Sequence, residues 1–168
     1  MSRVSAFDDV LSANAAYAED FPHAGATAPA SRGLAVLTCM DSRIDPLRAL
    51  GLEVGDFKML RNAGGRLTDD MRSDLVLASH LLNVKRVLIM PHTRCAMASN
   101  TDADVSAAIL SQAGLDAGDH AWHTVPDQLT RLGSDVDALR ADPLLNPGTV
   151  VSGAIYDVET GRIQIVVP

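Results

Sequence analysis

The chain of 168 residues is long enough for one domain, and a domain of this size buries roughly 70% of its unfolded surface without the help of disulfides. Apolar residues make up 47% of the chain and aromatic residues 4%, so the core must be built mainly from aliphatic side chains. The net charge of −7 disfavours nucleic acid and anionic membranes as partners, because no basic surface is available for phosphate groups.

The first residues do not have the pattern of a secretory signal, since Asp8 and Asp9 interrupt the apolar positions. No apolar run approaches the roughly 20 residues that a membrane-spanning helix needs. We therefore expect a cytoplasmic protein without a membrane partner. In that compartment Cys39 and Cys95 are more often metal ligands, catalytic thiols or buried core residues than a disulfide.

Residues 4–19 have the spacing of an amphipathic helix. Its apolar face comprises Val4, Phe7, Leu11, Ala15 and Ala18. Residues 22–33 are rich in Ala, Pro and Gly, which is typical of a linker. The sequence thus predicts a single domain in which an N-terminal helical arm and its linker occupy residues 1–32 and an α/β core occupies residues 33–168.

From residue 33 onward, short apolar runs alternate with helical patterns. The run over 34–38 is continuously apolar, which is typical of a strand buried on both faces. The expected elements after it are a strand over 57–60, a helix over 68–82, a strand over 86–90, helices over 99–110 and 125–139, and a hairpin of strands over 149–156 and 162–167. This alternation predicts an α/β fold with a central, mainly parallel β-sheet flanked by helices, and with an antiparallel strand at its C-terminal edge.

Residues with metal-binding or catalytic chemistry directly follow two of these strands. Cys39, Asp41 and Arg43 come at the end of the first strand, and His92 and Cys95 come after the third. Ligands of parallel sheets gather beyond the carboxyl ends of the strands. Parallel neighbours would therefore bring the two clusters together although they lie far apart in the sequence.

Two thiolates and one imidazole form a ligand set that occurs at catalytic zinc, where a fourth position is left for water. Cys39, His92 and Cys95 could supply this set. A structural zinc ion more often has four ligands, and the chain contains no third cysteine. A fourth ligand could still come from His80, His120, His123 or Asp41.

Asp41 and Arg43 indicate a role beside such a metal ion. The carboxylate could accept a hydrogen bond from zinc-bound hydroxide and orient it, and the guanidinium could keep the carboxylate ionised through a bidentate pair. Simpler interpretations stay open from the residues alone, because each cysteine could be a buried core residue and the charged pair could be a turn with its ion pair. A redox pair is a further alternative, but the two cysteines lack a C-x-x-C arrangement.

Three motifs together resemble the β-class carbonic anhydrases. Residues 39–43 match C-x-D-x-R, residues 61–64 match R-N-A-G, and residues 92–95 match H-x-x-C. Their order and spacing agree with the family. Residues 67–70, followed by a helix, resemble the short, mycobacterial-type bacterial members. The combination of all three motifs is far more specific than any one of them.

The resemblance implies a zinc ion bound by Cys39, His92 and Cys95, with Asp41 and Arg43 as the dyad beside it. It implies reversible hydration of carbon dioxide to bicarbonate by attack of zinc-bound hydroxide. In some family members the aspartate at the position of Asp41 moves onto the zinc ion and closes the site, so this residue is the candidate fourth ligand of a closed state. The resemblance also implies a homodimer or a dimer of dimers, in which the N-terminal helix reaches across to the neighbour.

One stretch departs from the family, which usually reads H-T-D-C-G where this chain has Arg94 and Ala96 at the third and fifth positions. If a helix begins near Cys95, Arg94 removes an N-cap, and its charge could lower the pKa of the Cys95 thiol or attract an anion. Ala96 adds a methyl group where glycine permits a positive φ or close packing. Two alternatives therefore accompany carbonic anhydrase activity. One is hydrolysis of carbonyl sulfide or carbon disulfide on the same scaffold, and the other is a non-catalytic zinc- or anion-binding homologue.

Overall fold

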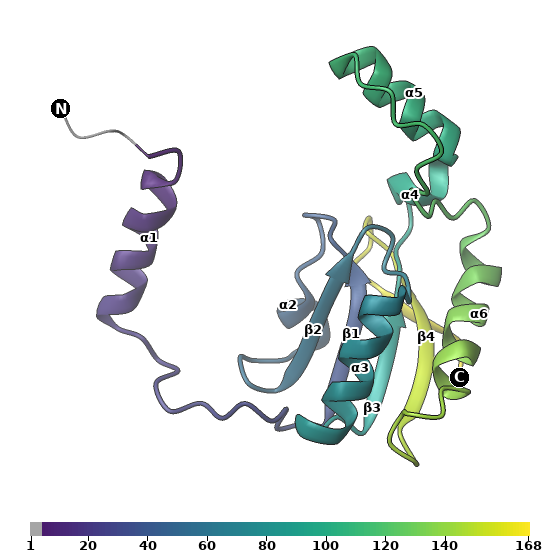
Figure 1. The fold of residues 1–168 in the computed structure, drawn as a ribbon. Helices are drawn as coiled ribbons and strands as arrows, with labels where there is room; N and C mark the ends of the chain where they lie inside the picture. The colour runs from purple at the N-terminus through teal and green to yellow at the C-terminus, as the bar shows by residue number, and fades with distance from the viewer. Residues whose placement is uncertain (1–4) are drawn as a thin grey trace.

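A computed structural model describes residues 5–168, so Val4, expected on the apolar face of the first helix, lies outside the described residues. A five-stranded sheet with the order β2-β1-β3-β4-β5 forms the centre of the molecule (Figure 1). The strands are β1 (Leu34–Cys39), β2 (Phe57–Asn62), β3 (Arg86–Met90), β4 (Val150–Tyr156) and β5 (Ile163–Val167). All neighbouring strands pair in parallel except β5, which runs antiparallel to β4 at the edge. The predicted mainly parallel sheet with an antiparallel C-terminal edge is confirmed.

The central strand β1 pairs with β2 on one side and β3 on the other, so it determines how the carboxyl ends of these three strands align. Its residues after Leu34 are all buried, because it has a parallel neighbour on each side and is covered on both faces. The register pairs Cys39 with Asn62 of β2 and Thr38 with Met90 of β3. The hydroxyl of Thr38 donates to the Met90 carbonyl at 2.6 Å, which satisfies a buried polar group. The carboxyl ends of three strands therefore lie side by side.

Two helices, α3 (Asp69–Leu81) and α6 (Gln128–Arg140), cover one face of the sheet (Figure 1). Their buried aliphatic side chains are Leu75, Ala78, Leu132, Val136 and Leu139. Each large aliphatic side chain that is fully buried stabilises the fold by roughly 1.5–3 kcal/mol. α6 lies so close to β4 that a Cβ atom at Gly153 would come 2.9 Å from the Leu132 side chain. The other face carries the short helix α2 (Pro46–Leu50).

The segment after β3 contains two helices, α4 (Ala96–Ser99) and α5 (Asp102–Ala113), where the sequence predicts a single helix over 99–110. Asn100 and Thr101 lie between them, and Thr101 is the N-cap of α5. Its hydroxyl accepts the N–H of Asp104 at 3.2 Å, and the Asp104 carboxylate accepts the N–H of Thr101 at 2.8 Å. This capping box favours a helix start at this point, so the predicted start at residue 99 is wrong.

The helix predicted over 125–139 begins later, at the first residue of α6. Pro126 disfavours helical backbone at Val125, and the Asp127 carboxylate accepts the N–H of Thr130 at 3.1 Å as the N-cap. Gln128 therefore lies in the first turn of α6, where it faces the strand ends.

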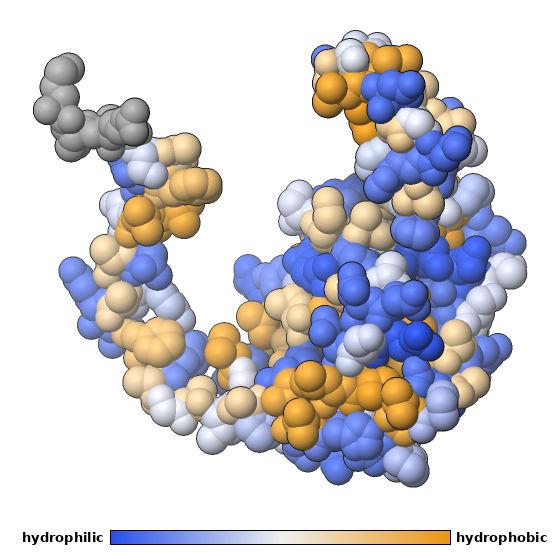
Figure 2. Space-filling view, in the orientation of Figure 1, coloured by the Kyte–Doolittle hydropathy of each residue, from blue (hydrophilic) through white to orange (hydrophobic). Residues whose placement is uncertain are grey.

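The N-terminal helix α1 (Asp8–Glu19) stands away from the sheet, and apolar side chains are visible on its surface (Figures 1 and 2). None of its residues is buried. The large apolar side chains exposed on or beside it are Phe7, Val10, Leu11 and Tyr17. None of the described helices, α1 included, is long and apolar enough to cross a membrane. An isolated helix of this length is marginal in water, so α1 needs a surface to pack against.

Candidate metal centre

Three potential ligands meet at the carboxyl ends of β1 and β3. Cys39 is the last residue of β1, His92 follows β3, and Cys95 is the N-cap residue of α4. The two sulfur atoms and a ring nitrogen of His92 lie within 4.8 Å of one another, and all three residues are buried. The parallel pairing of β1 with β3 thus unites the two clusters.

His92 is held through its backbone and through one ring nitrogen. Its Nδ1 lies 2.8 Å from the carbonyl oxygen of Thr93. Because a carbonyl oxygen only accepts, Nδ1 carries the proton in the neutral ring and Nε2 keeps a free lone pair. The side chain of Gln128 donates to the His92 carbonyl at 3.1 Å, which fixes the backbone.

The Nε2 atom of His92 is buried and has no hydrogen-bond partner among residues 5–168. Buried side-chain nitrogens are almost always satisfied, so an unused lone pair beside two thiols needs a partner. A metal ion is such a partner, and the second ring nitrogen of a metal-binding histidine is typically bonded to a carbonyl, as Nδ1 is here.

The two cysteine side chains interact directly, and each shifts the pKa of the other. The hydrogen bond from the Cys95 thiol lowers the pKa of Cys39 far below its usual range, against the opposing effect of burial. The backbone N–H of Gly64 donates to the Cys39 sulfur at 3.4 Å and acts in the same direction. The Cys39 thiolate in turn raises the pKa of Cys95. A metal ion displaces thiol protons, and two sulfurs and a nitrogen within 4.8 Å of one another fit a zinc ion.

Asp41 and Arg43 form a bidentate ion pair beside these donors. Oδ1 of Asp41 accepts the Nε–H of Arg43 at 2.9 Å, and Oδ2 accepts Nη2 at 2.7 Å. These bonds, together with the Arg43 backbone N–H, hold the pKa of Asp41 well below its usual range. Oδ2 also lies 3.7 Å from Nε2 of His92. The role of this pair beside a metal ion stays a prediction.

Arg61 is a part of the site whose role the sequence does not predict. Its Nε donates to the carbonyl of Cys39 at 2.9 Å, and its Nη2 donates to the carbonyl of Asp41 at 2.6 Å. The guanidinium therefore braces the turn that joins the first ligand to the charged pair. The available signal is its place in the R-N-A-G motif, and the register of β2 places Arg61 directly beside Thr38.

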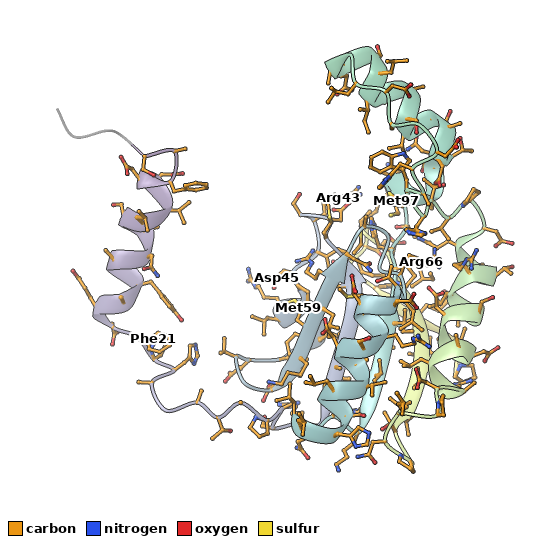
Figure 3. The ribbon with its side chains drawn as sticks, in the orientation of Figure 1. Phe21, Arg43, Asp45, Met59, Arg66 and Met97 are labelled. Carbon is orange, nitrogen blue, oxygen red and sulfur yellow. The ribbon has the colours of Figure 1, made fainter. Side chains whose placement is uncertain are left out.

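A cavity of about 190 Å³ opens beside the two sulfur atoms. Its lining residues are Cys39, Met40, Asp41, Ala63, Cys95, Ala96 and Met97. Figure 3 shows Arg43 and Met97 at the same end of the sheet. Apart from the Asp41 carboxylate, the walls are apolar or sulfur-bearing, which suits a small uncharged molecule.

The other histidines do not join the group of ligands that residues 5–168 form. Nε2 of His80 lies 2.9 Å from the carbonyl of Leu144, and His120 packs on Trp122 with a ring separation of 4.2 Å. His123 is absent from the group as well. Of the residues considered as a fourth ligand, Asp41 is the one that lies beside the group.

The two residues that depart from the family, Arg94 and Ala96, differ in backbone conformation. The positive φ is at Arg94, at 54°, whereas Ala96 is the first residue of helix α4. Ala96 therefore has helical backbone, and the positive φ that glycine would permit is not used at residue 96. The Arg94 guanidinium lies 3.0 Å from Glu159, and the hydrogen bond with Cys39 raises the pKa of Cys95.

Comparisons with known proteins agree with this site. Residues 34–129 match the sequence model of the carbonic anhydrase family. Beta-carbonic anhydrase 1 of Mycobacterium tuberculosis is 31% identical over 163 residues, which cover 96% of this chain and 98% of that protein. The carbon disulfide hydrolase of Acidithiobacillus thiooxidans is 32% identical over 158 residues, which cover 80% of this chain and 72% of that protein. The crystal structure of carbonic anhydrase from Streptococcus mutans has a TM-score of 0.88 at 36% identity and covers 97% of this chain and 98% of its own. The chain belongs to the carbonic anhydrase family, in its β class.

Proposed function

We propose that this protein is a zinc-dependent carbonic anhydrase that interconverts carbon dioxide and bicarbonate. The observation that carries the proposal is the buried group of Cys39, His92 and Cys95 with the Asp41–Arg43 pair directly beside it. The family match and the likeness to a mycobacterial β-carbonic anhydrase support the same activity.

The zinc ion would be held by the sulfurs of Cys39 and Cys95 and by Nε2 of His92. When bound, zinc supplies a Lewis acid that brings the pKa of a coordinated water close to 7. The chain keeps the donors in place through the bonds from His92 Nδ1 to Thr93 and from the Gly64 N–H to Cys39. Three protein ligands would leave one position for water, and the cavity lies beside the two sulfur atoms.

Asp41 would accept a hydrogen bond from the attacking water and so direct its lone pair toward the carbon of the substrate. Arg43 supports this role, because it binds both carboxylate oxygens and keeps the group ionised and fixed. Asp41 could instead reach the metal as a fourth ligand in a closed state. Its three hydrogen bonds from Arg43 favour a carboxylate that stays off the metal.

Carbon dioxide is small, linear and uncharged, and it fits the apolar cavity beside the sulfurs. Carbon disulfide and carbonyl sulfide share these properties, and a relative at 32% identity is a carbon disulfide hydrolase. Hydrolysis of these molecules is therefore the second candidate function. The complete ligand group and the intact Asp41–Arg43 pair disfavour a non-catalytic homologue.

We also propose that the active form is a homodimer or a dimer of dimers, built from an arm over residues 1–32 and a core over residues 33–168. The exposed α1 helix supports this, because none of its residues is buried against the rest of residues 5–168. A groove of about 450 Å³ on the sheet is lined by Leu34, Leu50, Leu52, Leu88, Val150 and Ile165, with Arg32 and Arg86 at its side. The apolar and acidic side chains of α1 from a second copy would complement it. A cytoplasmic location fits two cysteines that serve as metal ligands.

The test combines metal content with turnover on one purified sample. We expect about one zinc ion per chain and carbon dioxide hydration, measured by stopped flow from pH 7 to 9. If zinc-loaded protein hydrates carbon dioxide no faster than the uncatalysed reaction, the proposal is wrong. Sulfide release from carbon disulfide or carbonyl sulfide, measured on the same sample, decides between the two candidate activities. Light scattering measures the mass of the particle in solution. We expect the mass of two or four chains for the wild type and a lower mass for Leu11→Asp, which places a charge on the apolar face of α1.

A further inference from the structure

A second ion pair, between Arg66 and Asp135, joins helix α6 to the loop after β2. Nε of Arg66 lies 2.7 Å from Oδ2 of Asp135, and Nη2 lies 3.2 Å from Oδ1. The same carboxylate accepts the backbone N–H of Leu67 at 3.1 Å. The two side chains are only 14% and 9% exposed, and Arg66 points from its loop toward α6 (Figure 3). Asp135 therefore clamps the loop with three hydrogen bonds.

The loop that Asp135 clamps has little freedom of its own. The side chain of Asn62 accepts the N–H of Arg66 at 2.8 Å and donates to the Arg66 carbonyl at 2.7 Å. Gly64 and Gly65 both have positive φ, at 85° and 65°. A Cβ atom at Gly65 would come 3.1 Å from the backbone nitrogen of Cys39. The loop is thus pressed against the end of β1, and only glycine allows this approach.

The loop carries one group that acts directly on the proposed metal site. The backbone N–H of Gly64 points at the Cys39 sulfur, with a separation of 3.4 Å. A donor at this position stabilises negative charge on the sulfur and fixes the direction of its lone pairs. The position of this N–H depends on the loop, and the loop is held at its other end by Arg66 and Asp135.

We infer that Asp135 is a positioning residue for the metal centre, and this inference rests on the proposed zinc site. Through Arg66 and Leu67 it holds the loop so that the Gly64 N–H stays on the Cys39 sulfur, and it thereby sets how firmly this sulfur binds zinc. A buried ion pair is weak evidence for stability, because desolvation of the two charges offsets their attraction. Its effect on geometry is the better account of its presence. Asp135 also lies beyond residues 34–129, which match the family.

The test compares Asp135→Asn with a matched control, Asp142→Asn. Asp142 also pairs with an arginine, Arg72, at 3.5 Å, and its side chain is 5% exposed, but neither side chain forms a hydrogen bond or ion pair with residues 63–68 of the loop after β2. Zinc release to a coloured chelator is followed in both variants and in the wild type. We expect Asp135→Asn to release zinc about tenfold faster, and Asp142→Asn to release it at the wild-type rate.

A second readout reports on the Cys39 sulfur itself. In the cobalt-substituted protein, the thiolate-to-metal absorption band should shift in Asp135→Asn and stay unchanged in Asp142→Asn. If Asp135→Asn does not fold, Asp135→Glu keeps the charge on a longer stem and should release zinc at an intermediate rate. Unchanged release and an unchanged band in the Asp135 variants, or equal changes in the control, would overturn the inference. Because neither readout requires turnover, a wild type that binds zinc but does not hydrate carbon dioxide defeats only the proposed function.

Discussion

The guanidinium of Arg94 lies 3.0 Å from the carboxylate of Glu159, so the basic residue beside Cys95 faces the turn between β4 and β5 and not the proposed metal. The same turn is tied to the site by the N–H of Val158, which donates to the Thr93 hydroxyl at 3.1 Å. Side-chain exposures of 67% and 59% limit the ion pair to about 0–1 kcal/mol. The Arg94 side chain, which departs from the family, therefore makes its ion pair at the surface of the protein.

Replacing Arg94 with glycine should stabilise the protein. A non-glycine residue with left-handed backbone costs about 1–2 kcal/mol, and the added freedom of glycine in the unfolded chain offsets part of this gain. We expect Arg94→Gly to raise the free energy of unfolding by about 0.5–1 kcal/mol in urea denaturation of the zinc-loaded protein. Glu159→Gln is the control, since it removes the ion pair and leaves the backbone of residue 94 unchanged. A lower stability for Arg94→Gly would show that the guanidinium does more than pair with Glu159.

Asp41→Asn should separate catalysis from metal binding. Asparagine presents an amide N–H where the carboxylate accepts a hydrogen bond, and it weakens the pair with Arg43. We expect kcat/KM for carbon dioxide hydration to fall by about 10²-fold with zinc content unchanged. Asp45→Asn is the matched control, because Asp45 caps α2 by accepting the N–H of Arg48 at 3.3 Å and has no contact with the metal ligands. Loss of zinc from Asp41→Asn would instead make Asp41 a ligand.

Much of the fold and the site could be predicted from the sequence, because both depend on strand order. Continuous apolar runs predicted β1 and β3, and parallel pairing of these strands is sufficient to bring Cys39 and His92 together. The Asp41–Arg43 pair could be predicted because its two residues lie on one turn. The metal ligand roles themselves stay a prediction until metal is measured.

The contacts that could not be predicted from the sequence join elements that lie far apart along the chain. The role of Arg61 follows from the register of β2 against β1, and the bond between Arg66 and Asp135 follows from how α6 lies on the sheet. Arg61 belongs to the R-N-A-G motif, but the motif does not reveal its contacts, and no local pattern marks Arg66 as different from a surface charge. The positive φ at Arg94 is also set by tertiary contacts, because left-handed backbone is unfavourable for any residue with a Cβ atom in the absence of such contacts.

Met97 should influence the choice between substrates. It lines the cavity from α4, and its side chain packs over Gly64. Shortening it to alanine widens an apolar wall, which favours the larger sulfur-containing molecules over carbon dioxide. We expect Met97→Ala to raise the ratio of carbon disulfide to carbon dioxide turnover by about tenfold. Met59→Ala is the control, because Met59 is 45% exposed on β2 and does not line the cavity. An unchanged ratio would mean that the wall formed by Met97 does not contact the substrate.

Removal of the metal should expose an unusually acidic thiol. The pKa of Cys39 is lowered by the Cys95 thiol and by the Gly64 N–H, so Cys39 is a thiolate above this low value and becomes protonated only as the pH falls through it. An ordinary thiol is almost fully protonated at pH 6. We expect iodoacetamide to alkylate the metal-free protein at Cys39 faster than it alkylates glutathione at pH 6, with the modified residue identified by mass spectrometry. Zinc-loaded protein should be protected, and Cys95→Ala should slow the reaction because it removes the hydrogen bond that stabilises the thiolate. Preferential modification of Cys95 would show that the shared negative charge resides on the other sulfur.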